Sequence, residues 1–227
     1  MSPGRDQEWR RLARPSISDQ TSPNSIQRDP TVNPTGEWLF RHRTSLPIPL
    51  VLAVLAIPTS QTYAGTATVL AGVALTVAGE LVRLWGVRQI GVISRTRSDR
   101  LGPLITSGPF GYVRNPLYLG NIALWAGFAL VARLVWLVPV IVLLLGLAYH
   151  AIVRWEEGLL ETRLGAAYTA YAARVPRWLP HFRFQNSDFR LQADLRLFSW
   201  RETLFSERGT LIAMAAGYLL LWLKARF

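Results

Sequence analysis

Long apolar runs alternate with short polar segments along the chain from residue 46 onward. Apolar stretches of this length with few charges favour the interior of a bilayer, so they predict membrane-spanning helices. We expect five spans, over residues 46–63, 66–90, 117–131, 134–152 and 209–223. The pattern therefore predicts an all-α, polytopic membrane protein.

The first two predicted spans are not uniformly apolar. Three prolines in residues 46–63 predict a helix that is kinked or partly interfacial at its ends. Residues 66–90 begin with apolar side chains and then include Glu80, Arg83 and Arg88. Because charges at this depth are costly in lipid, we expect these three to face protein or a polar cavity.

The remaining spans differ in how they are connected. Two residues separate 117–131 from 134–152, which predicts a tight helical hairpin. The fourth helix is expected to continue past the membrane surface through Tyr168 until Pro176 ends it. Residues 189–205 predict an interfacial helix, because large apolar side chains recur on one face. These side chains are Leu191, Leu195, Phe198 and either Leu204 or Phe205.

Basic residues are concentrated on one side of this arrangement. The chain has 227 residues and a formal net charge of +11, and Lys224 is its single lysine among the basic side chains. Arginines gather in residues 1–45, 83–114 and 154–208, which the five spans place together. The positive-inside rule then puts this side and the N-terminus in the cytoplasm. We expect a protein of a bacterial inner membrane whose arginines meet anionic lipids rather than nucleic acid.

The polar N-terminal segment differs from the rest of the chain. Residues 1–36 show almost no apolar periodicity and predict a disordered cytoplasmic tail, while residues 37–227 predict one membrane-embedded domain. No apolar segment closely follows the early arginines, so no signal peptide is expected. The absence of Cys excludes disulfides, thiolate nucleophiles and Cys-based metal sites, and we expect no metal site.

A first motif-rich segment precedes the third span on the predicted cytoplasmic side. It contains GPFGYVRNPLYLG at residues 108–120, where Asn115 and Pro116 are typical of a helix start. Tyr112, Arg114 and Tyr118 fit two interpretations. They could be ordinary interface anchors, or they could form a binding wall with the backbone amides of the helix N-terminus. The residues alone leave both open.

A second motif-rich segment, residues 150–180, follows the fourth span on the same side. Glu156 and Glu157 could be solvated carboxylates at a helix end. If the helix continues, the pair lies mid-helix at the membrane surface, where one carboxylate can face inward.

Together the two segments resemble the isoprenylcysteine carboxyl methyltransferase family and the related phospholipid methyltransferases. Arg114, Pro116, Tyr118 and Gly120 match the family signature Gly-x-x-x-x-x-Arg-His-Pro-x-Tyr-x-Gly. The second segment is similar to the family's Glu-Glu block. Its matching residues are Glu156, Glu157, Leu160, Gly165, Tyr168, Tyr171, Val175, Pro176 and Pro180. The resemblance covers about residues 80–180, which we expect to form the catalytic core.

The resemblance implies an α-helical membrane methyltransferase whose C-terminal half holds S-adenosyl-L-methionine on the cytoplasmic side. The implied cofactor-binding residues are Arg95, Gly102, Pro103, Leu104, Ile105, Phe110, Asn115, Pro116, Leu117, Tyr118 and Glu156. The implied substrate is lipophilic or amphiphilic and enters from the membrane, with a carboxylate, amine or thiol as acceptor. Candidates for shaping the substrate side are Arg114, Arg154 and Glu157.

Two positions depart from the family pattern. Asn115 replaces the signature His, which leaves a side-chain amide where the family has an imidazole. Ile152 stands where the eukaryotic enzymes carry an Arg that helps hold the prenylcysteine substrate, and Arg154 is half a helical turn away. The second departure argues against a prenylcysteine carboxylate as the substrate.

Two other classes of function fit parts of the sequence. An NADPH-dependent reductase of the sterol reductase type has a similar helical layout, and Arg95, Arg97 and Arg100 could meet a 2′-phosphate. A membrane scaffold could instead use the basic face to bind anionic lipid or a partner protein. The Glu-Glu block favours the methyltransferase over the reductase.

Overall fold

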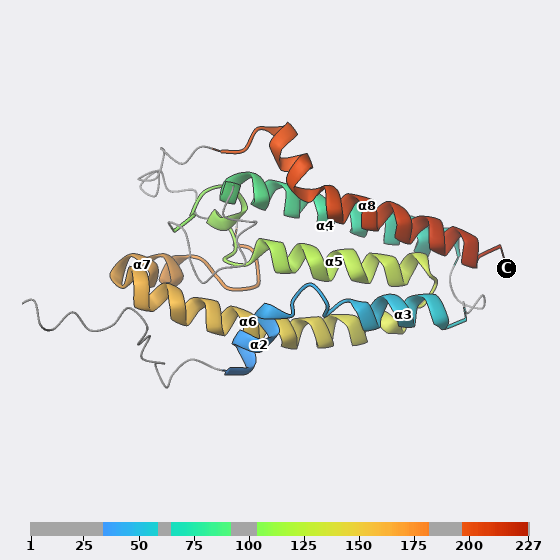
Figure 1. Ribbon diagram of the computed structural model, residues 1–227, viewed down its shortest axis with the longest axis horizontal. Coiled ribbons are helices and arrows are strands. Elements are labelled where there is room, and N and C mark those ends of the chain that lie inside the picture. Colours follow the sequence, from blue (N-terminus) through green and yellow to red (C-terminus); the bar gives the residue numbers. More distant parts are fainter. Residues whose placement is uncertain (1–33, 59–64, 92–103, 182–196, 227) are drawn as a thin grey trace, which may run out of the picture. The chain divides into compact units, whose positions relative to one another are not determined.

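The described part of the protein is entirely helical (Figure 1). The structure, a computed structural model, describes residues 34–58, 65–91, 104–181 and 197–226, all within the compact unit Val32–Phe227. These residues form seven α-helices and one short 3-10 helix, with no strand among them. The predicted all-α class is confirmed. Three helices are long and apolar enough to cross a membrane, namely α4 (Thr66–Ile90), α6 (Leu137–Leu164) and α8 (Trp200–Lys224).

The first predicted span is a shorter helix than expected. Helix α3 covers Ile48–Ala56, and Pro47 occupies its N-cap position. Residues 59–64, the end of the predicted span, lie outside the described residues. The N-terminal boundary also moves slightly, because α2 already begins at Pro34 and ends at Arg41. Residues 1–33 of the predicted tail over 1–36 lie outside the described residues.

Helices α4 and α5 (Pro116–Val131) pack closely through small residues. A Cβ added to Gly79 would lie 2.7 Å from the carbonyl oxygen of Gly120. A Cβ on Gly127 would lie 2.2 Å from Oγ1 of Thr76, a fully buried side chain. Small residues at a membrane helix interface allow this backbone approach and the dispersion contacts that come with it. Helices α4 and α5 therefore pack against each other as one closely packed pair.

Helix α6 forms the centre of the apolar core. Ile141 and Ile152 are fully buried, and they belong to one cluster with Leu124 of α5 and Val54 of α3. The burial of Ile152 explains why an apolar residue occupies this position. The side chain lies among packed neighbours, where an unpaired guanidinium would be costly. The departure from the family Arg is therefore consistent with the packing.

Two predicted helix boundaries are wrong, each because of a left-handed residue. Helix α5 ends at Val131 and α6 begins at Leu137, so the hairpin connection is longer than two residues and includes Arg133 with a φ of 61°. Helix α6 does not continue to Pro176. Gly165, with a φ of 49°, ends it, and α7 (Ala166–Arg174) starts in a new direction. Glycine adopts this conformation without the steric penalty of a Cβ.

The predicted interfacial helix and last span merge into one helix. Helix α8 starts at Trp200 because Ser199 and Glu202 form a capping box, with Ser199 Oγ accepting from the Glu202 amide at 3.2 Å. No Pro or Gly interrupts the helix between Leu204 and the start of the predicted span at Gly209. Leu191 and Leu195 of the predicted interfacial helix lie outside the described residues.

Candidate functional site

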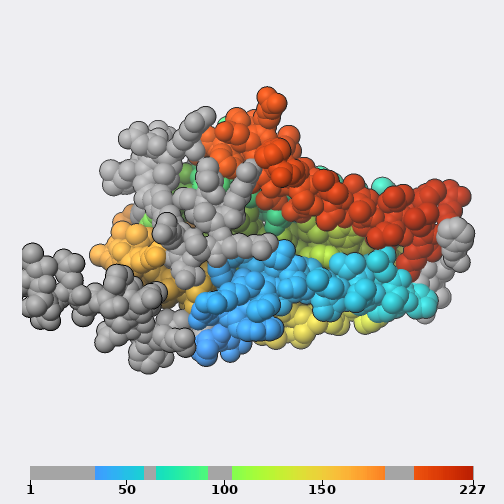
Figure 2. Space-filling model, in the orientation of Figure 1, coloured from blue at the N-terminus to red at the C-terminus, as the bar shows by residue number. Residues whose placement is uncertain are grey.

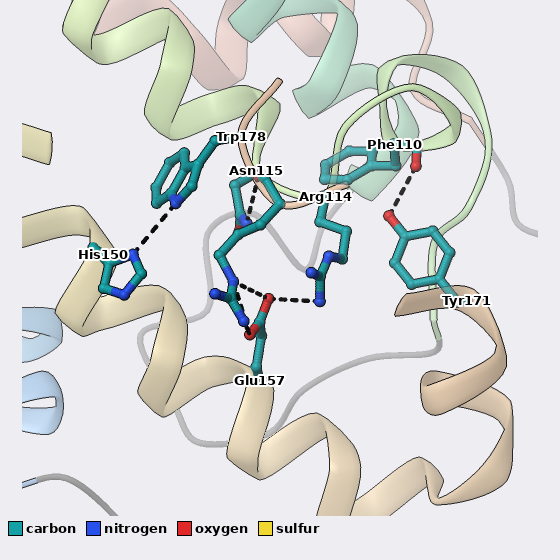
Figure 3. A network of polar contacts seen from close by, with 8 residues as sticks. Phe110, Arg114, Asn115, His150, Glu157, Tyr171 and Trp178 are labelled. Atoms are coloured by element: carbon teal, nitrogen blue, oxygen red, sulfur yellow. Dashed lines mark hydrogen bonds and ion pairs between the residues drawn. The ribbon is translucent and has the colours of Figure 1, made fainter. Parts of the chain in front are cut away.

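The two motif-rich segments meet in space through backbone contacts. The Arg114 amide donates to the Pro176 carbonyl at 2.9 Å, and the His181 amide donates to the Tyr112 carbonyl at 3.0 Å. Tyr171 on α7 donates its hydroxyl to the Phe110 carbonyl at 2.8 Å, which anchors the 3-10 helix η2 (Gly108–Gly111) (Figure 3). The segment after α7 thus runs beside the entry to α5.

Asn115 precedes the first residue of α5 as expected, but its side chain does not cap the helix. It occupies the N-cap position with Pro116 as the first helical residue, and its side chain makes no cap hydrogen bond. Instead, Asn115 Nδ2 donates to the Arg177 carbonyl at 3.2 Å. The amide is therefore a tether between the two segments, a task that requires an N–H donor.

Glu157 is held between two arginines. Its side chain is buried, with Oε1 2.9 Å from Arg114 Nη1 and Oε2 2.6 Å from Arg177 Nη2 (Figure 3). Arg177 Nε also lies 3.0 Å from Oε1, and these hydrogen bonds raise the pKa of Arg177. Two guanidiniums around one carboxylate leave one formal positive charge in excess. We call Arg114, Glu157 and Arg177 the arginine clamp.

Arg177 was not predicted from the sequence. It follows Pro176 in the second segment, where its charge resembles that of many other arginines. The clamp also leaves a donor unused, since Nε of Arg114 is buried without a hydrogen-bond partner among the described residues. A buried donor of this kind is costly unless a ligand or water satisfies it.

Glu156 has a separate environment from its neighbour. Consecutive helical residues point about 100° apart, so the two carboxylates of the Glu-Glu block face different partners. Glu156 Oε2 accepts from the Tyr118 hydroxyl at 3.1 Å, and the Tyr118 ring lies 4.7 Å from the Tyr149 ring. One carboxylate of the pair is thus fixed by arginines and the other by a tyrosine.

Both motif-rich segments line a single cavity of about 1130 Å³. Eight of the predicted cofactor-binding residues are on its wall: Leu104, Ile105, Phe110, Asn115, Pro116, Leu117, Tyr118 and Glu156. Arg114 and Glu157 from the substrate-side prediction also line it. Its volume lies slightly above the usual range for small-molecule sites, about 300–1,000 Å³.

The other predicted site residues either lie outside the described residues or do not line the cavity. Arg95, Gly102 and Pro103 lie outside the described residues. Arg154 is exposed and is absent from the cavity lining, although it lies only three residues before the cavity-lining Glu157 on α6. Arg43, from the segment between α2 and α3, also lines the cavity, and no sequence pattern predicted it.

The cavity continues from the motif-rich end into an apolar arm. Beyond Asn121, its lining includes Val54 of α3, Phe128 of α5 and Leu221 of α8. Figure 2 shows side chains of α5 between α3 and α8 on this face. At the far end, Lys224 Nζ lies 2.6 Å from the Val54 carbonyl oxygen and links α8 to α3. The arm suits a hydrocarbon chain.

Two tyrosines of α7 remain protonated beside the clamp. Burial raises the pKa of Tyr168 to about 12, and burial likewise raises the pKa of Tyr171 well above its usual range. Both hydroxyls are therefore hydrogen-bond donors at physiological pH. Among the residues that the structure describes, no group of three or more His, Cys, Asp or Glu is placed to hold a metal ion.

Comparisons with known proteins test the predicted family resemblance. Residues 67–167 match the phospholipid methyltransferase family model, so the predicted resemblance is confirmed over this segment. The chain is also 27% identical to the nickel-cobalt-cadmium resistance protein NccN of Alcaligenes xylosoxydans xylosoxydans over 162 residues, which cover 69% of this chain and 73% of the relative. No solved structure shows significant similarity to the chain.

Proposed function

We propose that this chain, a membrane methyltransferase of the phospholipid methyltransferase family by its residues 67–167, transfers a methyl group from S-adenosyl-L-methionine to a lipophilic or amphiphilic acceptor. One observation carries the proposal. The two motif-rich segments line one end of a cavity whose other end is an apolar arm between membrane helices. A polar cofactor and a substrate with a hydrocarbon chain can therefore meet within it.

The residues at the polar end fit the charges of this cofactor. A sulfonium cation is stabilised by aromatic faces and carboxylates, and Phe110, Tyr118 and Glu156 line the wall. A cofactor carboxylate suits the excess positive charge of the arginine clamp, including the buried Nε of Arg114 that has no partner among the described residues. The donor set thus matches two of the three charged groups of S-adenosyl-L-methionine, the sulfonium and the carboxylate.

The chemistry requires positioning more than a protein nucleophile. When bound, the cofactor supplies a methyl carbon that the acceptor's lone pair attacks as the carbon–sulfur bond breaks and its electron pair stays on sulfur. Glu156, fixed by Tyr118, would orient the cofactor through a charged hydrogen bond. The apolar lining excludes water from the acceptor, so alignment within the cavity supplies most of the rate enhancement.

The environments of two residues of α6 narrow the range of possible acceptor groups. Ile152 is fully buried and Arg154 is exposed, so neither supplies the cation that the eukaryotic enzymes direct at a prenylcysteine carboxylate. We place the site on the cytoplasmic side of a bacterial inner membrane, following the distribution of arginines. The acceptor atom can be the nitrogen, sulfur or oxygen of a membrane-soluble molecule.

Calorimetry with two ligands separates this proposal from the reductase. The purified full chain is titrated with S-adenosylhomocysteine and, separately, with NADPH. We expect heat from the first and none from the second. Binding of NADPH alone would favour the reductase, whose candidate arginines at 95, 97 and 100 lie outside the described residues. Binding of neither ligand would favour the scaffold.

Labelled methyl transfer then tests the activity. The protein is incubated with S-adenosyl-L-methionine carrying a labelled methyl group and with a lipid extract of the host. We expect label in the organic phase with wild-type protein and only background with Glu156→Gln. Label that appears equally with both proteins would contradict the assigned role of Glu156.

A further inference from the structure

Helix α2 packs closely on α6, although it lies outside the segment 67–167 that matches the family (Figure 1). A Cβ added to Gly36 would lie 2.5 Å from the Ala151 carbonyl oxygen and 2.7 Å from Cβ of Trp155. Four residues after Gly36, and so on the same face of α2, the Phe40 ring lies 4.7 Å from the Trp155 ring. This packing fixes α2 against the second half of α6.

Arg43 follows α2 and is brought to the cavity by this packing. Its guanidinium carbon lies 4.0 Å from the centroid of the Phe40 ring, a cation–π arrangement that restricts where the charge can lie. The side chain is half-buried, and it makes no ion pair with a described residue. Arg43 and Glu156 both line the cavity. The docked helix therefore contributes an unpaired cation to the cavity that contains Glu156.

The Glu156 carboxylate has no direct cationic partner among the described residues. It accepts one hydrogen bond, from Tyr118, whereas both guanidiniums of the arginine clamp are bound to Glu157. Arg43 is the cation with the strongest effect on Glu156, and its attraction exceeds the repulsion from the adjacent Glu157. A carboxylate in a cavity lined largely by apolar side chains is costly without a cation. Arg43 therefore offsets the charge of Glu156 without touching it.

We infer that Arg43 is a positioning residue of the cofactor end, and that it acts through Glu156. The inference rests on the proposed function, which assigns Glu156 to the cofactor. Tyr118 fixes one carboxylate oxygen by a hydrogen bond, and Arg43 keeps the carboxylate charged, so that the second oxygen remains an acceptor for the ligand. Without the cation, a proton on the carboxyl would neutralise it and turn one of its oxygens into a donor. An element outside the family-matched segment thus completes the site.

A double-mutant cycle on the purified full chain tests the action through Glu156. Wild type, Arg43→Gln, Glu156→Gln and the double variant are each titrated calorimetrically with S-adenosylhomocysteine. We expect Arg43→Gln to raise the dissociation constant about fivefold in the wild-type background but less than about twofold in the Glu156→Gln background, because the effects of coupled residues do not add. Equal factors in the two backgrounds would overturn the inference.

Arg43→Lys separates the charge from the stacking. It keeps the positive charge but loses the planar guanidinium that lies on the Phe40 ring. We expect a dissociation constant within about twofold of wild type, because the charge is what acts on Glu156. Arg41→Gln, which removes an exposed arginine that pairs with Glu37, is the matched control and should bind as wild type does. A loss in Arg43→Lys or in Arg41→Gln equal to that in Arg43→Gln would overturn the inference.

A second variant tests the docking of α2 and covers the case in which Arg43→Gln does not fold. The Cβ of Gly36→Ala would meet the Ala151 carbonyl oxygen of α6, so α2 must shift and move Arg43 with it. We expect a dissociation constant raised about threefold or more, and again less than about twofold in the Glu156→Gln background. Gly146→Ala on α6, where an added Cβ meets no atom within 4 Å, is the control. Wild-type affinity in Gly36→Ala would contradict the inference.

The outcomes separate the inference from the function beneath it. If wild-type protein binds S-adenosylhomocysteine and Arg43→Gln binds it equally well, the inference is overturned and the proposed function stands. Absence of S-adenosylhomocysteine binding by the wild type would overturn the proposed function and, with it, the inference.

Discussion

The arginine clamp and a second ionic cluster, formed by Glu80, Arg83 and Glu207, are built from the same groups in opposite proportion. In the clamp, Arg114 and Arg177 surround Glu157, whereas in the cluster Glu80 and Glu207 share Arg83. Both are largely buried and both join helices that are distant in the sequence. The difference lies in the sign of the excess formal charge, which is positive in the clamp and negative in the second cluster.

The two excess charges also differ in how they can be neutralised. A guanidinium stays protonated in proteins, so the positive surplus of the clamp is permanent and requires an anion. A carboxylate can take up a proton when its cation is lost, so a negative surplus can be neutralised at some cost. We therefore expect the clamp to be the more important of the two for folding.

The largest effect is expected from Glu157→Ala. It leaves Arg114 and Arg177 close together without their shared carboxylate, and breaking a buried ion pair in this way costs about 3–5 kcal/mol. We expect a strongly lowered thermal unfolding temperature in detergent and loss of S-adenosylhomocysteine binding. Glu161→Ala on the exposed face of α6 is the control. Wild-type stability in Glu157→Ala would show that the clamp does not hold the two segments together.

A smaller effect is expected from Arg83→Gln. The variant leaves Glu80 and Glu207 without their cation, but protonation of one carboxylate limits the cost to about 1–3 kcal/mol. Because protonation removes the repulsion, the variant should lose stability relative to wild type as the pH rises from mildly acidic to mildly alkaline. Thermal unfolding across this pH range measures the difference. A deficit that is constant with pH would contradict the charge argument.

The smallest effect is expected from Asn115→His. The Asn115 side chain contributes one N–H donor to the Arg177 carbonyl, and a protonated imidazole nitrogen can supply the same donor. We expect S-adenosylhomocysteine affinity within about threefold of wild type, less than one order of magnitude and therefore under about 1.4 kcal/mol. Asn115→Leu, which has no donor, should lose more. Equal affinity for the Leu and His variants would show that the tether is unimportant.

The sequence predicted the helical class and the meeting of the two motif-rich segments. Apolar runs identify membrane helices because the bilayer imposes their length, and Asn115 with Pro116 marks the start of α5 as expected. Eight of the predicted cofactor-binding residues share one cavity wall because they belong to two local motifs. Their role in holding the cofactor stays a prediction.

Other features depend on contacts that no local pattern encodes. Gly165 ends α6 because its φ is positive, although glycine also occurs inside α4 and α5. Arg177 and Glu207 are ordinary charges in the sequence, and only the fold brings them to Glu157 and Arg83. Helical position alone could not separate Arg154, which is exposed, from the cavity-lining Glu157, because residues three apart on a helix are neighbours on its surface.

The central claim is that Glu156, fixed by Tyr118, belongs to a binding site for S-adenosyl-L-methionine. Its most direct test is calorimetric titration of wild type, Glu156→Gln and the control Glu161→Gln with S-adenosylhomocysteine. We predict a dissociation constant raised about tenfold or more in Glu156→Gln, with unchanged thermal stability and wild-type binding in the control. Wild-type affinity in Glu156→Gln would contradict the claim.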